Sequence, residues 1–164
     1  MFWLLELLLD FAIGIALALI TRRFLCLFAI VKGSSMLDTL RNRDVLFALR
    51  RGMCGELRRF DVVLCRYPNR REYFVKRIVA LPGERIAVEG GALKIDGLPV
   101  DEPASIRLAR RDMVERRIGK DAYFVMGDNR PASRDSRSVG PIPKDWIVAV
   151  ARCVVFPPKR IRKL

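Results

Sequence analysis

The first 20 residues of the chain form one apolar run, which constrains the fold more than any other feature of the sequence. From Met1 to Ile20 only Glu6 and Asp10 interrupt a series made mainly of Leu, Ile, Phe and Ala. About 20 such residues are what a helix needs to cross the hydrocarbon core of a bilayer. The two carboxylates share one helical face near its start, where they can reach the membrane interface. We therefore predict a transmembrane helix over residues 1–21.

Two other structures suit an apolar run, namely a buried core helix and a cleavable signal peptide. A signal peptide opens with positive charge and ends in a cleavage site of small residues. This run opens with acidic residues and continues into Thr21-Arg22-Arg23, so the sequence favours a retained anchor. The basic residues near the run all follow it, which by the positive-inside rule would hold the body in the cytoplasm. That rule weakens for long translocated domains, so local charge does not decide the orientation.

The rest of the chain is strongly basic and contains no histidine. The 164 residues include 31 Lys or Arg and 18 Asp or Glu, for a net charge of +13. The basic and acidic groups of residues 1–40 cancel, so all of this charge lies in residues 41–164. Because 51% of the residues are hydrophobic, the chain can build a core, which excludes general disorder. The absence of histidine excludes a Ser-His-Asp triad, a Cys-His dyad and a His-ligated zinc site.

The four cysteines are scattered and form no C-x-x-C pair, which argues against a zinc ribbon or a thioredoxin-type motif. They are Cys26, Cys54, Cys65 and Cys153. Their spacing does not indicate a disulfide framework either. We expect free thiols that pack as small hydrophobic side chains.

After residue 40 the sequence changes to short β-type runs separated by turn residues. The runs cover residues 44–50, 60–66, 72–81, 85–88, 92–95, 123–126 and 146–156. Glu89-Gly90-Gly91 separates two of them and predicts a tight hairpin. Many short strands with Gly and Pro turns are typical of an all-β barrel or sandwich.

The sequence divides into an anchor, a connector, one body and a tail. We assign the anchor to 1–21, the connector to 22–32, the β-rich domain to 33–158 and a basic tail to 159–164. Residues 101–120 are highly charged and weakly periodic, so we expect an excursion from the β body there. A basic tail is usually a solvated end, and its alternative role is contact with anionic lipid headgroups.

Without histidine, a serine nucleophile needs another base, and the known substitute is a lysine. A lysine acts as a base only when it is neutral, which requires apolar surroundings that lower its pKa. Lys76 stands in the apolar run 72–81 and meets this condition. The alternative is an ordinary lysine facing outward from a half-buried strand, and the run alone leaves both interpretations open.

Three segments together decide between them. Gly33-Ser34-Ser35-Met36, Tyr73-Phe-Val-Lys-Arg-Ile-Val-Ala-Leu-Pro-Gly83 and Gly127-Asp-Asn-Arg with Ser133, Asp135, Ser136 and Arg137 follow in this order. They resemble the conserved boxes of bacterial type I signal peptidases. Val139-Gly-Pro-Ile-Pro143 and the run after it are also similar to that family. The resemblance covers nearly the whole chain and implies a signal-peptidase-like, all-β catalytic domain behind one N-terminal transmembrane helix.

The resemblance also implies a role for individual residues. Ser35 matches the nucleophile, Lys76 the general base, and Ser133 the serine that orients that lysine. The backbone amide of Ser35 matches the first oxyanion donor. The residues that match a supporting network are Asp128, Arg130, Asp135 and Arg137.

The chain departs from the family pattern at a few positions. Gly33 stands where some members carry a second, side-chain oxyanion donor, which must come from elsewhere or be missing; Ser34 is the nearest hydroxyl. Asp38 replaces a usual proline, and Arg43 replaces the glycine of a usual Gly-Asp pair. A carboxylate at Asp38, if close, would raise the pKa of Lys76 and weaken the base.

The implied substrates are secretory precursors with small residues at the first and third positions before the cut. The implied location is the bacterial cytoplasmic membrane, with a single span, contact with phospholipid and the catalytic domain on the extracytoplasmic side. The resemblance implies no cofactor and no metal, and we expect no nucleic-acid partner.

Three other functions fit parts of the sequence. Self-cleaving repressors also use serine and lysine, but they carry a DNA-binding or soluble arm in place of an apolar run. A membrane-tethered nucleic-acid binder would suit the +13 charge, yet the basic residues form no recognition motif. An inactive scaffold that binds secreted or pilin-like precursors differs only in whether Ser35 and Lys76 react.

Overall fold

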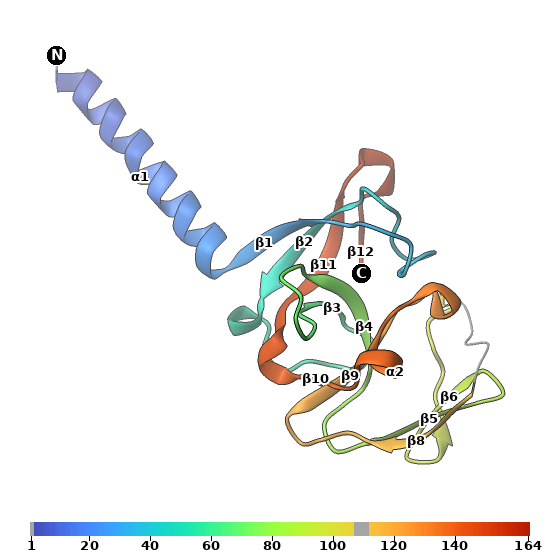
Figure 1. Cartoon of the computed structure of the whole chain (residues 1–164). Helices are drawn as coiled ribbons and strands as arrows, with labels where there is room; N and C mark the ends of the chain where they lie inside the picture. Colours follow the sequence, from blue (N-terminus) through green and yellow to red (C-terminus); the bar gives the residue numbers. More distant parts are fainter. Residues whose placement is uncertain (1, 107–111) are drawn as a thin grey trace.

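The structure is a computed structural model that describes residues 2–106 and 112–164. It consists of a projecting helix, a large curled antiparallel sheet and a smaller sheet beside it (Figure 1). The strands predicted from the sequence are confirmed in the larger sheet and in the hairpin of the smaller one.

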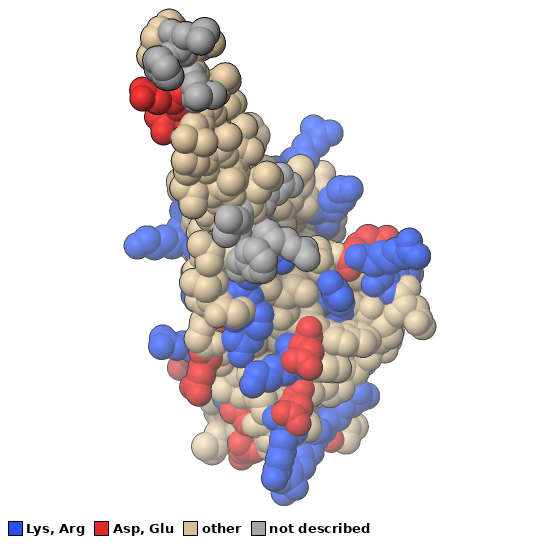
Figure 2. Space-filling model, turned by 90° about the vertical axis from the view of Figure 1, so that its left-hand side faces the viewer, with Lys and Arg blue, Asp and Glu red and all other residues tan. Residues whose placement is uncertain are grey.

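Helix α1 (Phe2–Phe24) projects from the body, with its N-terminal end far from the sheets (Figure 1). Its apolar side chains face solvent, as Trp3, Phe11 and Leu17 illustrate at 66%, 70% and 59% exposed. In Figure 2 the described surface of the helix carries acidic side chains near its tip and is otherwise mostly uncharged, whereas Lys and Arg spread over the body. Within the described residues, no helix combines the length and the apolar character that a membrane span requires.

The larger sheet has the strand order β1-β2-β11-β3-β4-β9-β10, and β12 also pairs with β11. Every pairing is antiparallel. Its strands are β1 (Cys26–Ile30), β2 (Val45–Arg50), β3 (Val62–Cys65), β4 (Phe74–Ala80), β9 (Ala122–Met126), β10 (Ile142–Pro143), β11 (Ile147–Phe156) and β12 (Arg162–Lys163).

Strand β1 lies in the segment that we predicted to be a connector. Leu27 and Ala29 pack against the core, while Phe28 and Ile30 are each 63% exposed. This alternation over five residues is that of a half-buried strand. It continues directly from α1, so helix and sheet are joined with almost no linker.

The smaller sheet has the order β7-β6-β5-β8. Its strands are β5 (Arg85–Glu89), β6 (Ala92–Ile95), β7 (Leu98–Pro99) and β8 (Met113–Arg117). Gly90 and Gly91 have φ of +56° and +83°, which suits the central positions of a two-residue hairpin, so the predicted hairpin is confirmed. The charged excursion at 101–120 contributes β8, and its residues 107–111 lie outside the described part of the chain.

Three clusters of buried side chains form the core. The first lies under β1, β2 and β11 and includes Met36 and Leu40, which come from the segment that follows β1. A second lies between β3, β4, β9 and β11, and a third joins β4 and β9 to the smaller sheet. The segment around Ser35 is therefore fastened to the core by its own apolar side chains.

The basic C-terminal segment is bound to the body along its length. After a turn at Pro158–Arg160, β12 pairs with β11, and the Leu164 amide donates to the Arg152 carbonyl at 3.0 Å. Arg160 forms two hydrogen bonds of 2.8 Å to the buried carboxylate of Asp44. Lys159, Ile161, Arg162 and Lys163 are exposed, so the side chains are mostly solvated as expected, while strand pairing and the Arg160–Asp44 pair hold the backbone of the segment.

Candidate active site

Ser35 lies on a compact turn between β1 and β2. The Leu37 amide donates to the Ser34 carbonyl at 3.1 Å, and the Leu40 amide donates to the Met36 carbonyl at 2.7 Å. Met36 and Leu40 are both buried, at 2% and 0% exposed. The turn is thus held by the core on one side and presents the serine hydroxyl on the other.

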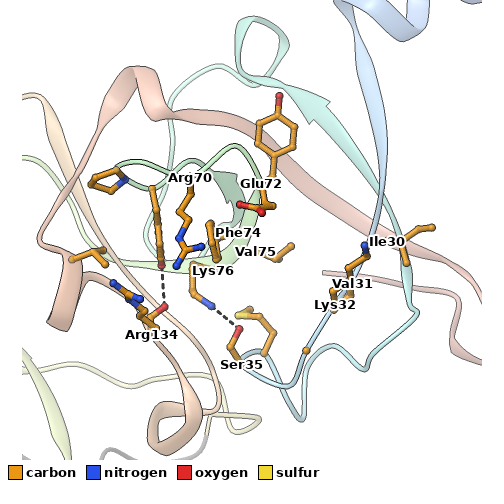
Figure 3. Close-up of a pocket in the computed structure, with 16 residues that line it drawn as sticks. Ile30, Val31, Lys32, Ser35, Arg70, Glu72, Phe74, Val75, Lys76 and Arg134 are labelled. Atoms are coloured by element: carbon orange, nitrogen blue, oxygen red, sulfur yellow. Dashed lines mark hydrogen bonds between the residues drawn. The ribbon is translucent and has the colours of Figure 1, made fainter.

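Lys76 occupies the middle of β4, opposite Val63 of β3, and is 2% exposed. Its Nζ atom is hydrogen-bonded to Ser35 Oγ at 2.5 Å (Figure 3). Burial lowers the pKa of Lys76 below its ordinary 10.5, although the negative charges of Asp135 and Asp128 oppose this shift. The amine therefore loses its proton more easily than an exposed lysine and can accept the proton of the serine.

Cys65, on the adjacent strand β3, is the cysteine that affects the pKa of Lys76. Burial raises the pKa of Cys65 to about 12, so this thiol stays neutral at physiological pH. All four cysteines are free, as the sequence predicted. Cys65 therefore contributes an apolar wall and no counter-charge for the lysine.

Ser133 lies beside the pair but forms no hydrogen bond to Lys76. Its Oγ is buried and has no hydrogen-bond partner among the described residues. The side chain packs over Gly127, where a Cβ atom would clash with Ser133 Oγ and with the Ser35 carbonyl oxygen. Glycine at 127 thus allows the three segments to approach closely.

Asp128 is fully buried and links the two halves of the site. Arg77, which follows Lys76 in β4, donates from Nε at 2.9 Å and from Nη2 at 2.6 Å to this carboxylate. Thr39, four residues after Ser35, donates to the same carboxylate at 2.5 Å. One carboxylate therefore ties the serine turn to the lysine strand.

Asp135 and Arg137 form a second pair with two hydrogen bonds of 2.8 Å. The Gly127 amide also donates to Asp135 at 3.0 Å, and Arg137 donates to the Arg130 carbonyl at 2.7 Å. Burial alone would raise the pKa of Asp135, but the bonds from Arg137 and Gly127 outweigh it and hold that pKa below 3.8. Asp135 therefore stays ionised and orders the loop around it.

Arg130, the last of the predicted supporting residues, is 2% exposed. It donates to the Gly127 carbonyl at 3.0 Å and forms an ion pair with Glu102, which belongs to the charged excursion. The four predicted supporting residues thus surround the Ser35–Lys76 pair, but only two of them pair with each other.

Sequence reasoning missed the partners of this network, which are Thr39, Arg77, Glu102 and Asn129. Asn129 is the most informative of them, because its amide donates to the Ser35 carbonyl and its side chain to the Ser34 carbonyl, both at 3.0 Å. Arg77 and Asn129 stand inside the two family boxes quoted for Lys76 and Asp128, which was the available signal. Thr39 keeps its usual place in the family pattern, which was a further signal, and Glu102 carried none.

The departures from the family pattern also have a place in the structure. The Gly33 amide, with φ of +90° at its residue, donates to Asn42 Oδ1 at 3.1 Å. Ser34 is exposed, and so is Asp38. The carboxylates that act most strongly on the pKa of Lys76 are those of Asp135 and Asp128.

A pocket of about 460 Å³ opens beside the Ser35–Lys76 pair (Figure 3). Apolar side chains from β1, β4 and the turns around them line much of it, including Ile30, Val31, Met36, Tyr67, Phe74, Val75 and Val139. Tyr67 and Phe74 stack with their ring centroids 4.2 Å apart. In residues 2–106 and 112–164 no cluster of acidic or cysteine side chains is arranged to hold a metal ion.

A buried lysine hydrogen-bonded to a serine, in a chain without histidine, is the arrangement of serine peptidases that use lysine as the base. The family described as signal peptidase, peptidase S26, matches residues 4–156. Signal peptidase I T of Bacillus subtilis (strain 168) is 35% identical over 163 residues, which cover 92% of this chain and 84% of that protein. Signal peptidase I of Bacillus amyloliquefaciens is also 35% identical, over 88% of this chain and 81% of that protein.

The crystal structure of a signal peptidase I from Enterococcus faecalis V583 superposes with a TM-score of 0.52 at 25% identity. The match covers 58% of this chain and 97% of the Enterococcus chain. The chain belongs to the signal peptidase family, peptidase S26, and is a serine endopeptidase of the signal peptidase I type. The mostly β body agrees with this membership.

Proposed function

We propose that the chain removes signal peptides from secretory precursors with Ser35 as nucleophile and Lys76 as general base. The observation that carries this proposal is the 2.5 Å contact between a serine hydroxyl and a buried lysine amine whose pKa is lowered by burial. Both partners come from segments that the body fixes, one by its core side chains and the other by strand pairing.

The reaction follows from this contact. Neutral Lys76 takes the proton of Ser35, whose Oγ attacks the scissile carbonyl and forms a C–O bond. The protonated amine of Lys76 then gives its proton to the departing nitrogen as the C–N bond breaks. In the second half, Lys76 takes a proton from water while the water oxygen forms a bond to the acyl carbon, and Lys76 then gives that proton to Ser35 Oγ as the ester C–O bond breaks and the acid leaves. Both halves begin and end with a neutral lysine.

The backbone amide of Ser35 is our first oxyanion donor. Loss of one such donor typically costs about 2.7–4 kcal/mol in the transition state. The Gly33 amide already donates to Asn42, and glycine has no side chain to offer, so residue 33 is not the second donor in this conformation. Ser34 presents an exposed hydroxyl next to the nucleophile and stays the nearest side-chain donor.

We assign supporting roles to the surrounding network. Ser133 orients Lys76, since its buried Oγ has no partner within the described chain and lies over Gly127 beside the Ser35 backbone. The pairs made by Asp128, Arg130, Asp135 and Arg137 hold the turn, the strand and the loop together. None of these charged side chains needs to touch the substrate to do so.

We propose that the substrate binds as an extended strand across the pocket, with small residues at the first and third positions before the cut. An extended peptide can use the outer edge of the chain at residues 30 and 32, and the part of β4 before Arg77, where β4 pairs with β3 but not with β9. The pocket between these segments is lined by apolar side chains and is of limited volume. Short side chains of the Ala-x-Ala type suit such a site.

We further propose that α1 anchors the chain in the bacterial cytoplasmic membrane as a single span, with the body on the extracytoplasmic side. Apolar side chains that are exposed on the helix, with none of its described side chains in the core clusters, support a lipid environment. Because α1 joins β1 with almost no linker, the anchor would hold Ser35 near the membrane surface. Alkaline carbonate extraction of cell membranes should leave the full chain in the pellet and release a variant that lacks residues 1–24. Protease added to spheroplasts should digest the body, whereas protection of the body would reverse the orientation.

The test of the reaction is cleavage of a precursor with an Ala-x-Ala site by the detergent-solubilised protein. We expect Ser35→Ala and Lys76→Ala to abolish cleavage, whereas Lys120→Ala and Lys144→Ala, at exposed positions, serve as matched controls. The parent should work best on the alkaline side, where Lys76 is neutral. If the parent binds the precursor but cuts nothing, or the Ser35 and Lys76 variants cut equally well, the chain is a binding scaffold instead.

A further inference from the structure

The loop that carries the supporting network holds three arginines, and they differ in their partners. Arg130 and Arg137 are bound to Glu102 and Asp135. Arg134 is exposed and forms no ion pair within the described residues, yet it lines the pocket that contains Ser35 and Lys76. Two of the three charges are thus neutralised, and the third is left at the catalytic pocket.

The backbone of Arg134 is fixed even though its side chain is unpaired. Its carbonyl accepts a hydrogen bond of 3.2 Å from the hydroxyl of Tyr67, which is 4% exposed and stacks on Phe74 (Figure 3). Its neighbours Ser133 and Asp135 belong to the site. Because the backbone is fixed, binding a partner orders only the side chain of Arg134 and not the loop that carries it.

Further unpaired cations lie on the rim of the same pocket. Lys32 and Arg70 line it, are exposed, and have no carboxylate partner in the described ranges; Glu72 is the pocket's single acidic lining residue. A shallower pocket of about 440 Å³ adjoins the first, shares Tyr67 and Arg70 with it, and adds Arg66 and Arg71. The entrance to the catalytic centre therefore carries an excess of positive charge.

The position of Arg134 indicates which part of a substrate passes it. In Figure 3, Ile30, Val31 and Lys32 lie on one side of the Ser35–Lys76 pair, and Arg134 lies on the other. With residues before the cut bound along 30–32, as proposed above, residues after the cut lead toward Arg134. A carboxylate within the first few residues after the cut would meet this guanidinium.

We propose that Arg134, assisted by the cationic rim at Arg70, selects substrates that carry an acidic side chain within the first three residues after the cut. This inference rests on the proposed function, because it assumes cleavage at Ser35. Exposed ion pairs are weak, so a modest preference of about two- to fivefold in kcat/KM is expected for each step of charge. High salt should reduce it, because exposed charges are screened.

The experiment uses the full chain in detergent and a series of peptides with one Ala-x-Ala site. The peptides carry Glu, Gln or Lys at the first, second or third position after the cut. At one position at least, we expect the parent to cleave the Glu peptide faster than the Gln peptide and the Lys peptide slowest. Arg134→Gln should flatten this order, and Arg134→Glu should invert it. Arg152→Glu, an equal change of charge on the exposed side of β11, should leave the order as in the parent.

The outcomes separate this inference from the proposed function. A parent that leaves every Gln peptide uncut contradicts the proposed function itself. A parent that cuts the Gln peptides but treats Glu, Gln and Lys alike at all three positions overturns the role of Arg134 alone. That role is also overturned if the order survives in Arg134→Gln and Arg134→Glu, or persists undiminished in 1 M salt.

Discussion

Lys76 and Arg77 are neighbours on β4, and the protein treats their charges in opposite ways. Both side chains are buried, at 2% and 7% exposed, and they point to opposite faces of the sheet. Arg77 meets the carboxylate of Asp128 and the Phe60 carbonyl. Lys76 meets the hydroxyl of Ser35. Because Lys76 and Arg77 are almost equally buried, the difference between them lies in the group that each side chain contacts.

The difference shows how one strand can carry a buried amine with a lowered pKa beside a structural cation. A guanidinium cannot lose its proton in a protein, so a buried arginine requires a carboxylate. A lysine can lose its proton, and burial without a contacting carboxylate favours that. Asp135, which pulls the pKa of Lys76 upward, is itself bound to Arg137, which limits its effect. The pKa of Lys76 therefore depends on whether the carboxylates near it are paired with arginines.

The largest effect is expected for Lys76→Met, which removes the base but keeps the volume and the apolar contacts. Cleavage should fall by roughly 10⁴-fold or more, because the base and the nucleophile act as a unit. The melting temperature should stay the same or rise, since no ion pair is lost. Parallel cleavage and calorimetry measurements check this. A melting temperature lowered as far as that of Asp128→Asn, described next, would mean that Lys76 is charged and paired.

Asp128→Asn tests the opposite face of the strand. It leaves Arg77 charged and buried without a carboxylate, which should cost about 3–5 kcal/mol of unfolding free energy. Denaturant unfolding of this variant, beside Asp121→Asn at an exposed position, measures the difference. Equal stability of the two variants would show that Arg77 finds another partner or water.

Gly127→Ala tests how closely the turn that carries Ser35 and the loop that carries Ser133 must approach each other. The added methyl group would meet Ser133 Oγ and the Ser35 carbonyl oxygen, so the turn and the loop must separate. We expect a loss of about 1–3 kcal/mol in stability and a larger loss in kcat than in KM. Gly119→Ala is the matched control, because a Cβ there meets nothing within 4 Å. If both variants behave as the parent does, the close approach is unnecessary.

The pH dependence of stability gives the smallest effect. Through Lys76 alone, the folded chain binds fewer protons than the unfolded chain between the lowered pKa of this amine and the ordinary value of 10.5. Above about pH 9, Cys65 and Tyr67 act in the opposite direction, because burial raises their pKa values above the ordinary 9.0 and 10.0. The parent and Lys76→Met share these two groups, so the unfolding free energy of the parent relative to Lys76→Met should rise with pH in this window, by at most about 1.4 kcal/mol per unit, and activity should rise as Lys76 loses its proton. A parent whose stability falls relative to that of Lys76→Met in the same window would contradict a neutral lysine.

The sequence pointed to Ser35 and Lys76, which the structure brings into contact, and predicted most of the strands but few of the partners. Ser35 and Lys76 stand in boxes with a fixed local order, and Gly90-Gly91 marks its hairpin through short-range turn chemistry. The pairing of Arg77 with Asp128 joins residues 51 positions apart, and that of Arg160 with Asp44 joins residues 116 apart. Such contacts depend on the folded topology, so local patterns carried no signal for them.

The sequence failed to predict strands β1, β8 and β12 for one common physical reason. β1 is short and follows the helix directly, and β12 has two charged, exposed residues. β8 is mostly charged as well, with a single half-buried side chain at Met113. Each becomes a strand because a neighbour offers a free edge, as β11 does for β12. Hydrophobic periodicity cannot reveal a strand whose stability comes from the backbone of its partner.

The pairing of β2 with β11 joins residues 45–50 to residues 149–156, which leave the ribosome roughly a hundred residues apart. The carboxylates of Asp128 and Asp135 also leave the ribosome late, and so does Arg160, which pairs with Asp44. During translation the serine and the lysine are therefore present long before anything holds them against each other. If Ser35 and Lys76 carry the proposed reaction, a chain that still lacks its last strands also lacks the contact on which that reaction depends.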